Sequence, residues 1–172
     1  MGGRADVRIQ DAFLSARFPQ PVMPRTPATP PARPHPPQRG TIAVVNDARA
    51  MDEAQNRVVA FLEEQQYPKA SMFALRLALH EALTNAFKHG HKGLPATLPV
   101  YLSYEVAHDH VDLDVEDQGP GFSPEEVPDP TLEENLERGS GRGLLLIRAY
   151  MSKVAYNDKG NRLSMRYARP KG

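Results

Sequence analysis

Apolar residues recur at helical spacing in two segments of the chain, and a third segment also predicts a helix. Residues 48–66 predict an amphipathic helix whose apolar positions are Met51, Ala54, Val58, Phe61 and Leu62. A second helix is expected over 71–89, where Ser71 would cap its start after Pro68 and Gly90 would end it. A third helix is expected over 141–153, and it opens in a run of glycines.

Short β-branched or alternating segments predict strands between these helices. TIAVVN (41–46) is one, and 98–109 and 110–117 form two more, joined by a tight turn near 108–110. Residues 153–158 and 162–169 predict a closing hairpin. The order of elements favours an α+β fold with helices on one face of a mostly antiparallel sheet.

Proline divides the chain into two regions. Nine of the seventeen prolines fall within residues 19–37, where the chain lacks the apolar residues that a core needs. We therefore predict a disordered Pro/Arg-rich tail over 1–39 and one folded domain over 40–170.

Charge and composition narrow the class of protein. The formal net charge is zero, so direct nucleic-acid binding is not expected. The chain shows neither a secretory signal nor an apolar run that would span a bilayer, so we expect no membrane partner. Cysteine is absent, which excludes disulfides and fits a cytoplasmic location.

The second helix carries a polar stripe opposite its core face. Glu81, Asn85 and Lys88 lie within roughly 60° of each other on a helical wheel with 100° per residue. The opposite side holds the apolar residues Met72, Leu75, Leu79, Ala82, Leu83 and Ala86. Ala74 and Ala78 flank the stripe, and we expect these small side chains to leave space over it. A solvated outer face would give the same pattern, so the stripe needs independent support.

Two glycine segments downstream supply that support. DVEDQGPGF (114–122) ends a strand with a carboxylate and then turns on Gly119 and Gly121. RGSGRGLLLI (138–147) places Gly139, Gly141 and Gly143 at the mouth of a helix, where backbone N–H groups can approach phosphate oxygens. Either segment alone is weak, but the order of all three segments is specific.

The three segments resemble the N, G1 and G2 boxes of the Bergerat-type (GHKL) ATP-binding fold, shared by gyrase, histidine kinases and mismatch-repair ATPases. HEALTNAFKHG, VEDQGPGF and GRGLLLIRAYMSKV are most similar to bacterial anti-sigma-factor serine/threonine kinases. The resemblance covers residues 41–168. It implies a two-layer sandwich of a mostly antiparallel mixed sheet with three helices on one face, and a lid at about 120–140.

The resemblance also implies roles for residues around the nucleotide. Asn85 would hold the Mg²⁺ that bridges the ATP phosphates, as an oxygen ligand suits a hard cation. Asp117 would accept a hydrogen bond from the adenine amino group. Gly119 and Gly121 would let the chain pass close to the nucleotide. Lys88, at a position that is basic in some relatives, would contact phosphate.

Further roles follow for phosphate binding and transfer. Glu81 would accept the proton of an attacking hydroxyl, and Arg138 would contact the γ-phosphate and the protein partner. The phosphates would lie against the start of the last helix, on Gly139, Gly141, Arg142 and Gly143. Ser140 stands where the kinases commonly have another glycine. The lid is acidic, and we expect Glu133, Glu134 and Glu137 to point away from the ATP.

The expected function is that of an ATP-dependent serine/threonine kinase that acts as an anti-sigma factor. Its partners would be a sigma factor and a small STAS-type antagonist that it phosphorylates, and the resemblance suggests a homodimer. The alternative is a non-catalytic module of the same fold that uses ATP only to shape its surface. A zinc site at the histidine pairs 89/91 and 108/110 is not expected, because neither pair has a third ligand nearby.

Overall fold

A computed structural model describes residues 35–122 and 142–170 of the chain. Its helical elements are α1 (Ala48–Glu64), α2 (Lys69–Asn85), η1 (Ala86–Gly90) and α4 (Arg142–Tyr150). Its strands are β1 (Gln38–Val44), β2 (Val100–Val106), β3 (His110–Glu116), β4 (Lys153–Tyr156) and β5 (Arg162–Ala168). Residues 1–34 of the tail predicted over 1–39, and residues 123–140 of the lid predicted at about 120–140, lie outside the described residues. The last two residues of the predicted tail, Gln38 and Arg39, belong to β1.

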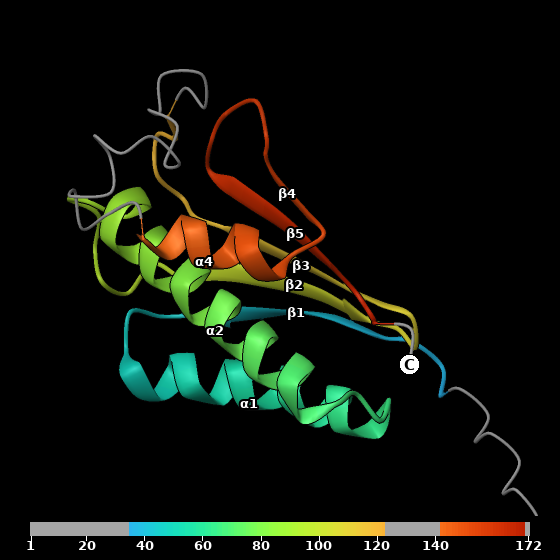
Figure 1. Ribbon diagram of the computed structural model, residues 1–172. Helices are drawn as coiled ribbons and strands as arrows, with labels where there is room; N and C mark the ends of the chain where they lie inside the picture. Colours follow the sequence, from blue (N-terminus) through green and yellow to red (C-terminus); the bar gives the residue numbers. More distant parts are fainter. Residues whose placement is uncertain (1–34, 123–141, 171–172) are drawn as a thin grey trace, which may run out of the picture. The chain divides into compact units, whose positions relative to one another are not determined.

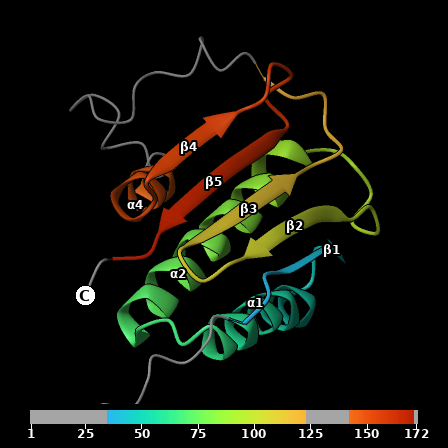
Figure 2. The same ribbon diagram turned by 90° about the vertical axis from the view of Figure 1, so that its right-hand side faces the viewer.

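The five strands form one sheet in the order β1-β2-β3-β5-β4, and α1, α2 and α4 lie on one face of it (Figure 1). Figure 2 shows the strands side by side with the helices behind them. All four described strand pairs are antiparallel, so the predicted α+β sandwich is confirmed, without a parallel pair in the described sheet.

Strict alternation in the central strands explains why the helices cover one face. In β2 and β3 every second side chain is buried, starting with Val100 and Val111. These side chains pack against apolar residues of the helices. The fully buried large side chains of this core include Val58, Leu62, Leu75, Leu79, Leu83, Leu102, Leu113 and Ile147.

The start of α2 differs from the prediction. The helix begins at Lys69, directly after Pro68, whose φ of −58° leads the chain into the helix. Ser71 is therefore inside the helix and does not cap it. Its side chain is buried, and its Oγ accepts a hydrogen bond from the Tyr167 hydroxyl at 2.8 Å. The cap prediction was wrong because a buried tyrosine on β5 uses the serine instead.

The end of the same helix changes its geometry. The predicted helix does continue to Gly90, but its last turn, η1, is π-helical. The His91 N–H donates to the Ala86 carbonyl, five residues back, at 2.9 Å. A π turn shifts the angular positions of the residues that it contains, so a regular helical wheel no longer applies there. Such turns often occur at functional sites.

The remaining elements lie close to the sequence predictions, except that the helix expected to reach residue 153 ends at Tyr150, and Lys153 already begins β4. The turn between β2 and β3 falls at 107–109, and β4 and β5 form the closing hairpin. The first strand begins at Gln38, slightly earlier than predicted, and pairs with β2 along its whole length. In the described part of the chain, no helix has the length and apolar character that crossing a membrane requires.

Candidate functional site

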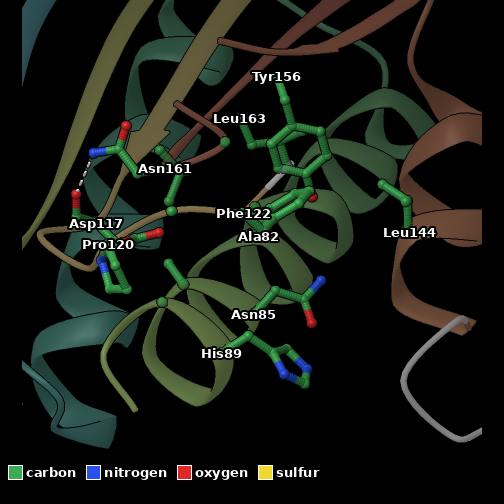
Figure 3. A pocket seen from close by; sticks show the side chains of 15 residues that line it. Ala82, Asn85, His89, Asp117, Pro120, Phe122, Leu144, Tyr156, Asn161 and Leu163 are labelled. Carbon is green, nitrogen blue, oxygen red and sulfur yellow. Dashed lines mark hydrogen bonds between the residues drawn. The ribbon is translucent and has the colours of Figure 1, made fainter. Parts of the chain in front are cut away.

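A cavity of ≈ 370 Å³ lies between α2–η1 on one side and the ends of β3 and β5 on the other (Figure 3). Fifteen residues line it: Ala82, Asn85, Ala86, His89, Gly90, Val115, Asp117, Pro120, Gly121, Phe122, Leu144, Tyr156, Gly160, Asn161 and Leu163. The cavity is large enough for a small organic ligand. Its walls are mostly apolar, and a few polar side chains point into it.

Asp117 is the acidic side chain of this wall, and only 9% of it is exposed. Its Oδ1 accepts the N–H of Gly119 at 2.8 Å. Burial raises the pKa of its carboxyl, while the Gly119 N–H and the nearby Lys159 cation act in the opposite direction. A buried carboxylate with unused acceptor positions suits a ligand that donates a hydrogen bond.

The main chain of Asp117 is fixed by the β4–β5 turn. The Asp117 N–H donates to the Asn161 carbonyl at 2.9 Å, and the Asn161 side-chain amide donates to the Asp117 carbonyl at 2.8 Å. Figure 3 shows the second of these bonds. Asn157 supports the turn, because its Oδ1 accepts the N–H groups of Asn161 and Arg162.

Two glycines allow the helix end to approach Asp117 closely. A Cβ on Gly90 would collide with the Asp117 carboxylate, and a Cβ on Gly119 would collide with the Gly90 carbonyl. The end of η1 and the segment after β3 are thus in direct backbone contact. The sequence pointed to Gly119 as a close approach and assigned Gly90 only the end of a helix.

Gly121 and Gly160 join the segment after β3 to the β4–β5 turn. Both have positive φ, 79° and 75°, a conformation that side-chain-bearing residues rarely adopt. A Cβ on Gly121 would collide with the Lys159 carbonyl, and a Cβ on Gly160 with the Phe122 carbonyl. The Phe122 N–H also donates to the Lys159 carbonyl at 3.1 Å. Gly121, Phe122 and Gly160 of this contact all line the cavity.

Aromatic side chains form the wall opposite α2. The rings of Phe122 and Tyr156 meet edge to face, with centroids 4.9 Å apart, and both line the cavity (Figure 3). Burial raises the pKa of the Tyr156 hydroxyl above its ordinary value of 10.0. Together with Leu144 and Leu163, these rings offer an apolar surface to a flat ligand.

The polar stripe of α2 divides between two environments. Asn85 lines the cavity, together with His89 from η1 (Figure 3). Glu81 is half-buried but does not line it. A Cβ on Gly143, in the first turn of α4, would come to 2.5 Å from the Glu81 Oε2 and 3.4 Å from the Asn85 Nδ2. The first turn of α4 therefore lies directly against the stripe.

The expectation about the two alanines beside the stripe was wrong. Ala74 and Ala78 are buried in the core rather than flanking open space. Both belong to the cluster of buried apolar residues that forms the core of the protein. The space that the sequence suggested for a ligand over Glu81 is partly taken by α4.

Lys88 has a different place from the one its spacing suggested. It is exposed and is absent from the cavity lining, which contains His89 instead. The π turn accounts for the difference, because it shifts the positions after Asn85 away from the regular helical wheel. Its expected contact with phosphate stays a prediction.

Of the other predicted site residues, Asn85, Asp117 and Gly121 line the cavity. Gly119 and Gly143 do not line it, but each allows a close approach between elements that surround it. Arg142 is the first residue of α4. Arg138, Gly139, Gly141 and the lid glutamates lie outside the described residues. Asn161, Tyr156 and Gly160 were missed, although the turn residues of NDKGN (157–161) could have marked that segment.

The side chains present limit how the cavity could hold a metal ion. In residues 35–122 and 142–170, no three histidine or acidic side chains gather closely enough to enclose a cation. The Asn85 carboxamide offers one neutral oxygen ligand in the cavity. A hard cation there would need further oxygen ligands from a bound anion and water, which is the usual way that Mg²⁺ binds with a phosphate ligand.

Comparison with known proteins agrees with this geometry. Residues 44–167 match the histidine kinase-like ATPase domain family. The chain is 32% identical to an anti-sigma F factor of Bacillus cytotoxicus over 104 residues, which are 59% of the chain and 70% of that protein. It is 31% identical to an anti-sigma F factor of Halalkalibacterium halodurans over 112 residues, 62% of the chain and 75% of that protein. It is also 32% identical to the serine-protein kinase RsbW of Staphylococcus epidermidis over 97 residues, 52% of the chain and 61% of that protein.

Proposed function

The chain belongs to the histidine kinase-like ATPase domain family, and from this premise we propose that it is an ATP-dependent serine/threonine protein kinase that acts as an anti-sigma factor. It transfers the γ-phosphoryl group of ATP to a small STAS-type antagonist and sequesters a sigma factor in the cytoplasm. The names of its relatives support this class of activity. The observation that carries the proposal is that one cavity is lined by both the buried Asp117 carboxyl and the Asn85 carboxamide.

The base of ATP lies at the Asp117 end of the cavity. The Asp117 carboxylate accepts a hydrogen bond from the adenine amino group, and its burial makes that bond selective for a donor. Phe122 and Tyr156 provide an apolar wall for the ring. This placement directs the phosphates toward Asn85 and the first turn of α4.

The phosphates of ATP would lie near Asn85, which would hold Mg²⁺ together with them. Asn85 supplies an oxygen ligand, and its place in the cavity lining next to α4 fits this role. When bound, Mg²⁺ neutralises charge on the phosphate oxygens. The N-terminus of α4 adds favourable positive potential, and Gly143 lets its backbone approach closely. Gly139, Gly141, Arg142 and Arg138 are the further phosphate-binding residues of this proposal.

Phosphoryl transfer then needs a group that takes the proton of the acceptor hydroxyl. Glu81 takes it as the serine or threonine oxygen forms a bond to the γ-phosphorus. The bond between that phosphorus and the β,γ-bridging oxygen breaks, and ADP leaves. Glu81 lies beside the first turn of α4, one helical turn before Asn85.

A label-transfer assay tests the proposal. The full chain is incubated with γ-labelled ATP, Mg²⁺ and a STAS-type antagonist from the same genome, and we expect label on the antagonist. Glu81→Gln keeps the size of the side chain and should reduce transfer by about 100-fold or more while ATP affinity stays within about threefold. Label transfer by Glu81→Gln at the wild-type rate would show that Glu81 is not the base.

One observation favours a second function. Glu81 is outside the cavity lining, next to Gly143, so its carboxylate could serve only to hold α4. The chain would then be a module that binds partners in response to ATP without transferring phosphate. No label transfer, together with ATP-dependent binding of the antagonist or sigma factor, would establish this alternative. The proposal also includes a homodimer, which sedimentation of the full chain tests.

A further inference from the structure

We propose that His91 is a positioning residue for recognition of the nucleotide base, through the peptide that follows Asp117. The inference rests on the proposed binding of ATP in the cavity. His91 does not line that cavity and so does not touch the ligand. It acts on the segment that carries the base-binding carboxylate.

The His91 ring is held firmly from its own side. His91 follows η1 directly and is only 7% exposed. Its N–H donates to the Ala86 carbonyl, and its carbonyl accepts the Leu94 N–H, both at 2.9 Å. Its ring meets the Phe87 ring edge to face, with centroids 5.5 Å apart. The π turn therefore fixes where the imidazole points.

The ring then makes one hydrogen bond across to the segment after β3. The His91 Nε2 accepts the backbone N–H of Gln118 at 3.2 Å, so we assign the ring proton to Nδ1. The Gln118 side chain donates to the Pro99 carbonyl at 2.8 Å. Gln118 is thus anchored through both its main chain and its side chain.

The environment of the His91 Nδ1 indicates that this side chain does more than fill space in the core. The His91 Nδ1 is buried and has no hydrogen-bond partner among the described residues. Burying an unpaired polar group costs about 1–3 kcal/mol. An apolar ring would fill the same space without that cost. What histidine adds here is the Nε2 acceptor for the Gln118 N–H.

The His91 Nε2 fixes Gln118, the middle residue of the segment from Asp117 to Gly119. Asp117 is paired with Asn161 through its main chain, and the Gly119 N–H holds the Asp117 Oδ1. Gln118 lies between them, so its peptide orientation sets how the Gly119 N–H and the carboxylate meet. Without the His91 bond, the Gln118 N–H is left unpaired and the carboxylate loses its fixed direction toward the base.

A pair of variants and a pair of nucleotides test this inference. His91→Phe keeps a ring against Phe87 but removes the acceptor, and His91→Gln restores an acceptor oxygen. The full-length chain is titrated with ATP and with purine riboside triphosphate, which lacks the 6-amino group. A merely structural role would change the affinity for both nucleotides equally.

We expect His91→Phe to weaken ATP binding about tenfold, in line with one lost hydrogen bond to a buried group. Binding of purine riboside triphosphate should change less than about twofold, because Asp117 has no amino group to recognise there. His91→Gln should recover most of the ATP affinity. Equal losses for both nucleotides, or no loss for either, would overturn the inference while leaving the proposed function intact.

Two further results keep the test decisive. A wild-type chain that binds neither nucleotide would overturn the proposed function, and this inference with it. Should His91→Phe fail to fold, hydrogen exchange of the Gln118 amide in the wild type replaces it. Slow exchange is expected from the His91 bond, and exchange as fast as that of an exposed amide would overturn it.

Discussion

Asp117 illustrates at the residue scale how a residue of the proposed binding site can reduce stability. Burial raises the pKa of its carboxyl above the ordinary value of 3.8. The folded protein therefore holds this proton more tightly than the unfolded chain does. The stabilising contribution is present at pH values below 3.8 and is lost as the pH rises through the raised pKa. At neutral pH the carboxylate is ionised at a cost to the fold.

We predict that Asp117→Asn melts at a higher temperature than the wild type at pH 7. The asparagine oxygen still accepts the Gly119 N–H, but no buried charge remains. The difference in melting temperature should shrink as the pH falls toward 3.8. The same variant should bind ATP about 10- to 100-fold more weakly, because a hydrogen bond to a charged acceptor is lost. Thermal melts across pH and ATP titrations measure both effects, and a variant that melts lower at pH 7 would contradict the argument.

The sequence identified residues of the cavity correctly where a polar side chain stood out from its immediate neighbours in the chain. Asn85 and Asp117 stood out because a polar group on a core helix and a carboxylate at a strand end are unusual. Asn161 and His91 were not predicted, because each makes a hydrogen bond to a backbone group that is distant in the sequence. The spacing of residues along the chain gives no sign of such a bond. Lys88 was placed by a regular helical wheel, and the π turn invalidates that wheel after Asn85.

At the scale of elements, the cavity depends on the contact between the segment after β3 and the β4–β5 turn. We predict that Gly160→Ala destabilises the protein by at least about 2 kcal/mol, from a strained φ and a collision with a backbone carbonyl that cannot move away. Its affinity for ATP should fall as well, because Gly160 lines the cavity. Urea unfolding and ATP titration measure the two effects.

Gly93 offers a matched control for this substitution. It also has a positive φ, of 83°, but a Cβ there would meet nothing within 4 Å. Gly93→Ala should therefore cost about 1 kcal/mol from the backbone strain alone and leave ATP affinity unchanged. Equal destabilisation by the two substitutions would show that the contact between Gly160 and Phe122 adds nothing.

The packing of α4 on α2 gives a different kind of prediction. In Gly143→Ala the new Cβ meets the Glu81 Oε2, the mobile end of a flexible side chain. The carboxylate can swing aside, so stability should stay within about 1 kcal/mol of the wild type. Phosphoryl transfer should fall by more than ATP affinity does, because Glu81 leaves its position. Transfer at the wild-type rate would show that the position of Glu81 beside α4 is unimportant.

The sequence predicted the elements well because their apolar patterns are local and strong. β2, β3, β4, β5 and α1 lie close to the predicted ranges, since alternation and helical spacing continue almost to their ends. The cap of α2 was missed because a tertiary contact, the Tyr167 hydroxyl, takes the Ser71 side chain. The space over Glu81 was misjudged because a wheel shows one helix and not the neighbour that packs on it.

At the scale of the whole molecule, the fold brings together segments that are far apart in the sequence. The cavity combines α2, the end of β3 and the turn before β5, with residues from Ala82 to Leu163. Each segment separately fits an ordinary helix or turn. Their convergence on one space, together with the family match over 44–167, makes ATP binding the central claim.

Calorimetric titration of the full chain with ATP, in the presence and absence of Mg²⁺, tests that claim most directly. We predict saturable binding of one ATP per chain within the micromolar to millimolar range typical of enzyme substrates. Affinity should rise with Mg²⁺ in the wild type but not in Asn85→Ala, and it should fall in Asp117→Asn. The absence of binding at millimolar ATP and Mg²⁺, or binding that neither substitution alters, would contradict the account.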